Sequence, residues 1–189
     1  MSADLVRSAI ASIDWRTGSL AGDSVRETVR TLAELKDVFR DPTATELPPD
    51  TVVYRVQRLD DRSGDEGALL WGTTVLEPGV VGDEYFMTHG HFHQKRERGE
   101  FYATVMGEGM LVLMDEQRNC WAEKMFPGSL HYVSGATAHR VVNTGEIPLR
   151  FVACWASDAG HDYSAIAQQG FGIRVVRRAG VPAVVRSDL

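Results

Sequence analysis

The HGHFH stretch that begins at His89 places three histidines within five positions. On an extended chain, side chains two positions apart point to the same side. His91 and His93 are therefore expected to share one face, and His89 joins them only if Gly90 leaves the strand regular. Two imidazoles on one face form half of a metal site. A further imidazole and a carboxylate must come from other parts of the chain.

Two glutamates downstream compete to supply the carboxylate. Glu97 lies within QKRERG, a polar stretch that indicates a solvated turn. Glu100 begins an apolar run that ends at Gly107, so it is expected to begin a strand that pairs back against the histidine segment. We therefore predict that Glu100, not Glu97, is the acidic ligand.

The distant imidazole is expected from His139, at the start of the apolar run HRVVN, because antiparallel barrels gather distant strands around one lumen. His131 is interpreted instead as a surface or hydrogen-bonded core histidine. Three imidazoles that face one interior cost free energy unless they are paired or bind a metal. With one carboxylate they suit one divalent first-row metal. Iron is the first candidate, and manganese, nickel and zinc are the alternatives.

The composition of the 189-residue chain, 43% apolar and 24% charged, is that of a globular protein. Its net charge of −6 argues against a nucleic-acid partner, so Arg26 and Arg30 are interpreted as solvated surface. No apolar run is long enough to span a bilayer, and the N-terminal segment lacks the pattern of a leader. We therefore expect a cytoplasmic protein without a membrane partner. Cys120 and Cys154, without CxxC spacing, are expected to be reduced, buried thiols.

Residues 1–47 are expected to form an N-terminal arm that contains a short helix. Asp23 or Ser24 is the expected cap of this helix. Its apolar positions recur at steps of three and four: Val25, Val29, Leu32, Leu35 and then Val38 or Phe39. The prolines of DPTATELPPD then break regular structure.

Short runs rich in Val, Thr, Tyr and Phe alternate with Gly, Pro and Asp turns from Thr51 to about Ser157. The expected strands are 51–57, 68–76, 101–107, 109–115, 119–126, 129–134, 139–143 and 149–156, with two more in the tail at 172–178 and 182–187. Many short strands at this spacing predict an all-β antiparallel sandwich or barrel. We expect a single domain over 1–189, with the barrel at 48–158 and a C-terminal arm at 159–189.

The motifs resemble those of the cupin superfamily. Its first motif, HxH followed by a glutamate and then a glycine, corresponds to His91, His93, Glu100 and Gly107. Its second motif corresponds to Gly128, His139 and Asn143, with Ser134 and Ala136 in place of the usual proline and glycine. The resemblance implies a cupin double-stranded β-helix, or jelly-roll, barrel with a short N-terminal helix and terminal arms. It also implies a metal in the barrel mouth.

A closer resemblance is to the cupin-type glucose-6-phosphate isomerases, best known from archaea. It rests on the strings TTVLEPGVVGDEYFMTHGHFH, AHRVVN and DAGHDYSAIAQQGF. It implies a homodimeric enzyme of glycolysis and gluconeogenesis that interconverts glucose 6-phosphate and fructose 6-phosphate. Apolar residues of the arms, among them Leu20, Phe171 and Val176, are expected to pack against a partner subunit or against the barrel wall.

The resemblance also implies a set of site residues. The implied metal ligands are His91, His93, Glu100 and His139. The phosphate of the sugar phosphate is implied to contact Thr74, Thr88 and Gly90, with Tyr102 nearby, and further substrate contacts are implied for Tyr54, His161 and Tyr163. The sequence departs from the family pattern at His89, where a lysine is frequent, and at Trp155, where a phenol commonly lines the pocket.

Aldose–ketose isomerisation needs a Lewis acid for two adjacent oxygens and a path for the hydrogen that moves between C1 and C2. Our hypothesis is that Glu100 is the base of a cis-enediol route, and a direct hydride shift is the alternative. His161 and Tyr163 either shuttle protons or only line the pocket. The rival functions are a cupin dioxygenase or sugar epimerase, and a non-catalytic cupin that binds sugar phosphates.

Overall fold

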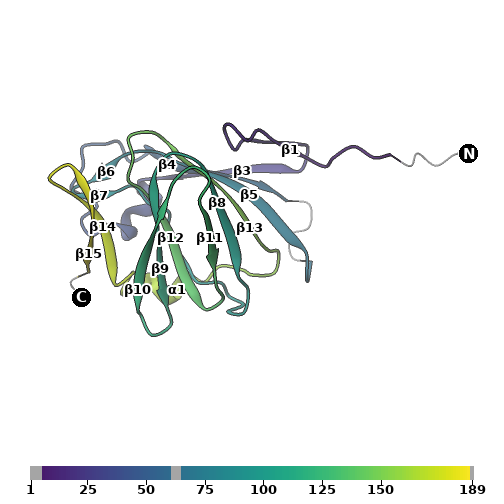
Figure 1. The fold of residues 1–189 in the computed structure, drawn as a ribbon. Helices are drawn as coiled ribbons and strands as arrows, with labels where there is room; N and C mark the ends of the chain where they lie inside the picture. Colours follow the sequence, from purple (N-terminus) through teal and green to yellow (C-terminus); the bar gives the residue numbers. More distant parts are fainter. Residues whose placement is uncertain (1–5, 61–64, 188–189) are drawn as a thin grey trace, which may run out of the picture.

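The computed structural model describes residues 6–60 and 65–187 of the chain. Within these residues the fold is almost entirely β, as predicted (Figure 1). The N-terminal elements are β1 (Ser12–Ile13), β2 (Leu20–Ala21), β3 (Val25–Thr31) and the 3₁₀ helix η1 (Ala33–Val38). They are followed by β4 (Val52–Leu59), β5 (Leu69–Leu76), β6 (Val80–Val81), β7 (Glu84–Tyr85), β8 (Glu100–Met106), β9 (Gly109–Asp115), β10 (Cys120–Met125), β11 (Leu130–Val133), β12 (Thr137–Asn143) and β13 (Leu149–Ala156). A one-turn helix α1 (Ser164–Ala167) precedes β14 (Ile173–Arg178) and β15 (Val181–Arg186).

Two antiparallel sheets form the walls of the barrel. The larger has the strand order β11-β8-β13-β5-β4-β3, and the smaller has the order β10-β9-β12. Side chains alternate between the two faces of a strand. On β8, accordingly, Glu100, Tyr102 and Thr104 are buried and Phe101 is exposed. The inner rows of both sheets share one apolar core, in which Leu111 of β9 is fully buried. The predicted two-sheet barrel is therefore confirmed.

A third sheet, with the order β15-β14-β7-β6, ties the C-terminal tail to the barrel. Its two tail strands, β14 and β15, lie where strands were predicted, and they pair antiparallel. Phe171 and Val176 are buried within this single chain, so of the two alternatives they pack against the barrel wall. Glu84 is only 2% exposed and accepts hydrogen bonds from the Arg174 guanidinium and the Arg40 backbone N–H, each at 2.5 Å. This buried carboxylate therefore joins the tail to the segment after η1.

The predicted N-terminal helix is wrong over its first half. Val25–Thr31 form β3, which pairs antiparallel with β4, so this part of the expected arm is the edge strand of the large sheet. The β-branched residues Val25 and Val29 favour extended structure, and β4 offers backbone partners that a helix would not use. The second half is helical, as η1, with Leu35 and Val38 buried.

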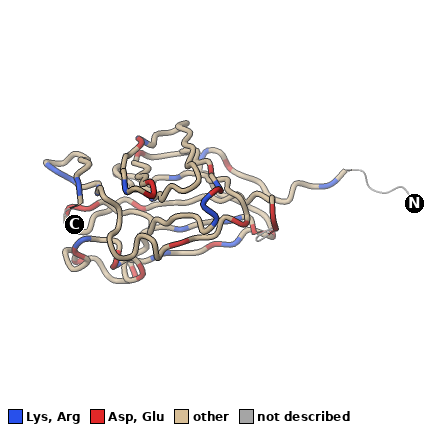
Figure 2. The backbone as a smooth tube through the Cα atoms, turned by 90° about the horizontal axis from the view of Figure 1, so that it is seen from below, with Lys and Arg blue, Asp and Glu red and all other residues tan. Residues whose placement is uncertain are grey.

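The surface outside the barrel combines an apolar N-terminal segment with mixed charge. The segment that leads to β1 runs away from the barrel (Figure 1) and carries exposed side chains at Val6 and Ile10, and Trp15 is exposed between β1 and β2. Charged residues of both signs are interspersed along the rest of the chain (Figure 2). No helix among the described residues is long and apolar enough to cross a membrane. The outermost residues of the two expected arms, 1–5 and 188–189, lie outside the described residues.

The two cysteines are free thiols, as expected from their spacing. Neither is fully buried, however: Cys120 and Cys154 are both half-buried. Cys154 lies on β13 and Cys120 on β10. The expectation of reduced thiols is therefore confirmed, and the expectation of complete burial is wrong.

We expect the substitution Glu84→Gln to destabilise the protein by about 3 kcal/mol, because it leaves the Arg174 guanidinium without its carboxylate in a largely buried site. Asp83→Asn is the matched control. Its ion pair with Arg40 is exposed, so its expected cost is below about 1 kcal/mol. Urea unfolding followed by circular dichroism measures both free energies. Equal costs for the two changes would contradict the role given to Glu84.

Candidate metal centre

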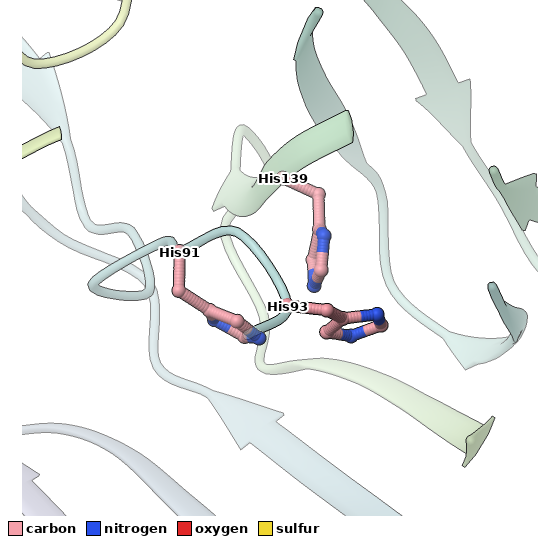
Figure 3. Close-up of side chains that lie close together, drawn as sticks. All are labelled: His91, His93 and His139. Atoms are coloured by element: carbon pink, nitrogen blue, oxygen red, sulfur yellow. The ribbon is translucent and has the colours of Figure 1, made fainter. Parts of the chain in front are cut away.

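Three histidines from two distant parts of the chain converge inside the barrel (Figure 3). His91 and His93 lie in the segment between β7 and β8, and His139 lies in β12. One ring nitrogen of each lies within 4.8 Å of the others. Figure 3 shows the three side chains pointing toward one another. The three imidazoles named from the sequence therefore form one cluster.

The segment that carries two of these histidines is not a regular strand. Gly90 has a φ of +79°, a left-handed conformation that other residues rarely adopt. An isolated bridge joins the segment to β12, with the His91 and His139 backbone N–H groups each donating to the carbonyl of the other residue, at 3.2 and 3.0 Å. The irregularity at Gly90 directs His89 elsewhere, and its ring stacks on Tyr163 with centroids 4.6 Å apart. His89 is therefore not part of the histidine cluster.

Backbone carbonyl groups orient two of the three rings. His93 Nδ1 lies 2.7 Å from the Arg98 carbonyl oxygen, and His139 Nδ1 lies 3.3 Å from the Thr137 carbonyl oxygen. Each contact favours a proton on Nδ1 and leaves Nε2, which faces Glu100, with a free lone pair. This is the tautomer that a metal ligand needs.

Glu100 is the first residue of β8 and is buried. Its Oε1 lies 2.6 Å from His139 Nε2 and 3.9 Å from His93 Nε2. Neither Glu100 Oε1 nor His139 Nε2 has a partner in hydrogen-bond geometry, although both atoms are buried. Buried polar atoms without partners are rare in folded proteins, and two that face each other within a histidine cluster fit the donors of a divalent cation. Glu97, by contrast, is exposed in the turn.

Burial and mutual contact determine the charge of the cluster. Burial lowers the pKa of His91 well below its ordinary value, and it lowers the pKa of His93 against the opposing effect of Glu100. Burial raises the pKa of Glu100, but His139 outweighs this effect and the net shift is downward. Burial lowers the pKa of His139, but Glu100 outweighs this effect and the net shift is upward. The cluster thus combines an ionised carboxylate with neutral imidazoles at His91 and His93, the protonation states that bind metals.

A cavity of about 350 Å³ opens over the cluster. His91, Glu100 and His139 line it. The residues that the resemblance implied as phosphate or substrate contacts line it as well: Tyr54, Thr74, Thr88, Gly90, Tyr102, His161 and Tyr163. Trp155, where the chain departs from the family pattern, also lines it. A cavity of this size, with a few polar groups that converge on it, suits a small-molecule ligand.

Three uncharged side chains surround the histidine cluster. The His161 ring lies 4.3 Å from the His91 ring and is nearly parallel to Tyr163, with 5.9 Å between their centroids. Burial lowers the pKa of His161 and raises that of Tyr163. Burial and the neighbouring Glu100 carboxylate raise the pKa of Tyr102 well above its ordinary value. These groups can therefore exchange hydrogen bonds with a ligand while remaining neutral.

Ion pairs fasten the turn before β8 to the segment after β13. Asp158 pairs with Lys95 at 2.7 Å and with Arg98 at 2.8 Å, and Asp162 pairs with Arg96 at 2.7 Å. These contacts position the segment that carries the two rings above the cluster. The sequence analysis assigned QKRERG to a solvated turn and missed this role. The signal was the matching pair of acids in DAGHDY.

Arg140 is a buried cation behind the histidine segment that the sequence analysis also missed. Its guanidinium donates to the His89 carbonyl oxygen at 2.8 Å and lies over the Phe171 ring at 4.4 Å. Its Nε has no hydrogen-bond partner, and a Cβ placed on Gly90 would lie 3.0 Å from it. Burial lowers the pKa of Arg140 to about 9, which leaves it protonated at neutral pH. Glycine is therefore required at position 90 both for the backbone conformation and for space.

The cavity wall formed by β3 and β4 carries three arginines, Arg26, Arg30 and Arg58. The sequence analysis interpreted the first two as solvated surface. They are exposed, as expected, but the surface that they cover is the wall of the cavity. Their position depends on the β3–β4 pairing, which the helix prediction excluded.

An antiparallel two-sheet barrel with three inward imidazoles and a buried carboxylate defines this chain as a cupin. A family profile described as "Glucose-6-phosphate isomerase (GPI)" matches residues 29–187. The chain belongs to this glucose-6-phosphate isomerase family, as the resemblance implied.

Curated relatives are similar over most of their length. The glucose-6-phosphate isomerase of Thermococcus onnurineus is 41% identical over 175 residues, which cover 92% of this chain and 91% of that protein. The glucose-6-phosphate isomerase of Pyrococcus horikoshii is 41% identical over 176 residues, 92% of each chain. That of Sinorhizobium medicae is 37% identical over 177 residues, 90% of this chain and 80% of that protein.

Solved structures of oxalate decarboxylases are similar to a smaller part of the chain. A formate complex of the Lactobacillus farciminis enzyme has a TM-score of 0.46 at 14% identity, over 58% of this chain and 30% of that chain. A deletion mutant of the Bacillus subtilis enzyme has a TM-score of 0.45 at 18% identity, over 61% and 29%. Similarity at this level carries no argument about function.

We expect the purified protein to contain about one divalent metal ion per chain and the variant His139→Ala to lose it, because the variant removes one buried donor. His131→Gln is the matched control. His131 is also buried, but it is bonded to Glu123 at 2.7 Å outside the cavity, as a core histidine. Elemental analysis by mass spectrometry of the folded proteins measures the metal content. Equal content in His139→Ala and the unaltered protein would rule out this site.

Proposed function

We propose that the protein is a metal-dependent aldose–ketose isomerase that interconverts glucose 6-phosphate and fructose 6-phosphate, in glycolysis and gluconeogenesis. The observation that carries the proposal is the buried contact of Glu100 with His139 beside a ligand-sized cavity, in a chain of the glucose-6-phosphate isomerase family. The names of the relatives favour this reaction over a dioxygenase, an epimerase or a binding-only cupin.

We infer that His91, His93, His139 and Glu100 hold one divalent ion per subunit. The unpartnered Glu100 Oε1 and His139 Nε2 support this assignment. Iron is the first candidate, with manganese, nickel and zinc as alternatives, because three imidazoles and one carboxylate suit any of these ions. When bound, the ion supplies Lewis-acid polarisation of the sugar carbonyl.

Glu100 is the proposed base. It is ionised and lines the cavity, so its carboxylate can take a proton from C2 of glucose 6-phosphate and return it to C1. The electron pair of the broken C–H bond forms the C1–C2 double bond of a cis-enediol, and the carbonyl then forms at C2. A direct hydride shift from C2 to C1 is the alternative, and it needs no base.

The isomerisation also moves a proton between the two sugar oxygens, and we assign this transfer to His161 and Tyr163. His161 is neutral and lies beside the His91 ring, so it can accept a proton from one oxygen and return it to the other. Tyr163 is nearly parallel to that imidazole and remains protonated, as a hydrogen-bond donor. The ion pairs of Asp158 and Asp162 support this arrangement by fixing the segment.

The remaining contacts are proposed for the body and the phosphate of the sugar. Thr88 Oγ1 accepts a hydrogen bond from the Val141 N–H at 3.0 Å, which leaves its own proton available to a ligand. Thr74 and the Gly90 N–H are the other two groups proposed for the phosphate. Tyr54, Tyr102 and Trp155 line the cavity between these groups and the cluster, where the sugar hydroxyls are expected.

We further propose that the protein is a cytoplasmic homodimer. Residues 1–189 form a single cupin domain, with the barrel at 48–158 and an arm at each end. Although β3 lies in the N-terminal arm, it adds an edge strand to the large sheet of the barrel. The outer face of the large sheet supports a dimer. It exposes Leu130 and Tyr132 on β11, Phe101 on the neighbouring β8, and Leu69 on β5, two strands further along. Grouped apolar side chains on a surface mark interaction sites.

Protein stripped with a chelator is expected to lose the conversion of fructose 6-phosphate to glucose 6-phosphate and to recover it when one of the four candidate metals is returned. A coupled assay that detects glucose 6-phosphate measures the rate. His131→Gln, which alters a histidine outside the cavity, should behave like the unaltered protein. Full activity without metal, or none with any of the four, would contradict the proposal.

In D₂O we expect solvent deuterium at the carbon that receives the proton, because a proton held by a carboxylate exchanges with water before its return. Glu100→Gln should lower kcat by more than about 100-fold, in protein whose metal content is measured in parallel. Mass spectrometry of the sugar detects the deuterium. Its complete absence at every pH tested would support the hydride shift and remove Glu100 from the role of base.

A further inference from the structure

We propose that Trp155, packed on Gly72, determines which face of the sugar meets Glu100, so that fructose 6-phosphate gives glucose 6-phosphate and not its C2 epimer, mannose 6-phosphate. The reaction in this proposal rests on the proposed isomerase function, whereas the packing of the two residues does not. Trp155 and the glycine within the predicted strand 68–76 are distant in the sequence. The structure brings them into contact on the wall of the cavity.

The indole of Trp155 rests on the backbone of Gly72. Trp155 lies on β13 and Gly72 on β5, and the strand register pairs Gly72 with Ala153, two positions before Trp155. Such diagonal neighbours are about 7–8 Å apart, within reach of a long aromatic side chain. A Cβ added to Gly72 would lie 3.0 Å from Cη2 and 3.1 Å from Cζ3 of the indole. The six-membered ring of the indole therefore occupies the space that a side chain at position 72 would need.

The backbone itself does not require glycine at position 72. Gly72 is not among the residues with a left-handed φ, and it lies inside β5, between β4 and β13. Glycine inside a strand weakens the strand and often marks a site where another group approaches closely. Two groups approach here, the Trp155 indole and the Gln57 carbonyl oxygen, which would lie 3.1 Å from the added Cβ. They predict different outcomes for variants, because only the indole can be replaced by a smaller ring.

Trp155 is also the direct neighbour of the proposed base. On its other side β13 pairs with β8, and the register places Trp155 opposite Glu100. Directly opposed residues of antiparallel strands have Cβ atoms about 5 Å apart. Both side chains line the cavity, as do Ala153 and Gly72. Because Ala153 and Gly72 are small, the indole covers this part of the sheet with a flat apolar surface beside the Glu100 carboxylate.

Imidazole groups line the other side of the cavity. His139 lies on β12 of the smaller sheet, whereas Trp155 lies on the larger one. A backbone bridge joins His91 to His139, and the His161 ring lies 4.3 Å from the His91 ring. The three histidines and Trp155 all line the same cavity. A sugar held at the cluster is therefore bounded by the indole on one side and by imidazoles on the other.

The stereochemistry of the reaction depends on which face of C2 meets the base. In the direction from fructose 6-phosphate, Glu100 takes a proton from C1 and returns it to C2 of the planar enediol. Delivery to one face of C2 gives glucose 6-phosphate, and delivery to the other gives mannose 6-phosphate. Rotation about the C2–C3 bond exchanges the two faces, and it needs space beside the base. The indole fills this space, and its face offers no acceptor to a hydroxyl that turns toward it.

The products formed from fructose 6-phosphate test the specificity. We expect Trp155→Ala to raise the ratio of mannose 6-phosphate to glucose 6-phosphate at least about tenfold, because it removes the surface that blocks rotation. Trp155→Phe keeps part of that surface and should give an intermediate ratio. Trp121→Ala is the matched control, since Trp121 is 41% exposed on β10 and does not line the cavity, and its ratio should equal that of the unaltered protein. Coupled assays for each product, early in the reaction, measure the ratio.

Substitution at both positions tests the packing. Gly72→Ala should push the indole into the cavity and raise KM for fructose 6-phosphate about tenfold. Phenylalanine lacks the ring atoms Cη2 and Cζ3 that meet the added methyl group. The double variant Gly72→Ala/Trp155→Phe should therefore have a KM within about twofold of that of Trp155→Phe alone. A double variant as impaired as Gly72→Ala would assign the glycine to the Gln57 carbonyl and contradict the packing.

Fluorescence gives a readout of the packing that does not depend on activity. Displacement of the indole into the water of the cavity should shift the emission of Trp155 to longer wavelength in Gly72→Ala. The emission of Trp155 is obtained by subtracting the spectrum of Trp155→Phe from that of the unaltered protein. The same subtraction, of the double variant from Gly72→Ala, gives its emission beside the added methyl group. Identical difference spectra would contradict the contact between the two residues.

The outcomes separate this proposal from the isomerase function. An unaltered protein that does not interconvert the two sugar phosphates would refute that function and the specificity that rests on it, while the fluorescence shift would uphold the packing. An active protein whose Trp155→Ala variant keeps the product ratio would overturn the specificity and leave the isomerase function intact. The product ratio decides even if Gly72→Ala does not fold, because Trp155 is only half-buried and its truncation leaves Gly72 in place.

Discussion

The contact between Glu100 and His139 is the constraint on which the rest of the site depends. Two buried polar atoms, 2.6 Å apart and outside hydrogen-bond geometry, cost free energy unless a cation satisfies both. The fold holds them in place, since Glu100 begins β8, His139 lies in the fully buried β12, and the two sheets that carry them share one core. The other imidazoles, the cavity and the rings above it are arranged around this pair.

The cavity combines two regions of different chemistry. Around the cluster, burial keeps His91 and His93 neutral beside one carboxylate, which favours a bound cation. Along β3 and β4, Arg26 and Arg30 are exposed and positively charged, which favours an anion.

The sequence predicted the cluster better than it predicted the wall of the cavity. Period-two spacing brings His91 and His93 together even without a regular strand, and the boundary between turn and strand separates Glu100 from Glu97. The N-terminal pattern was ambiguous, because Val25 and Val29, four positions apart, share a face in a helix and in a strand. The edge of β4, distant in sequence, decides between them. Since only that pairing turns the arginines of β3 into the cavity, no local pattern could reveal them.

The most direct test of the metal centre is anomalous X-ray scattering from crystals of the protein, recorded at the absorption edge of the metal found by elemental analysis. We predict one strong peak within about 2.0–2.3 Å of His93 Nε2, His139 Nε2 and a Glu100 carboxylate oxygen. Absence of a peak there, with Glu100 in a direct hydrogen bond to His139, would contradict the account.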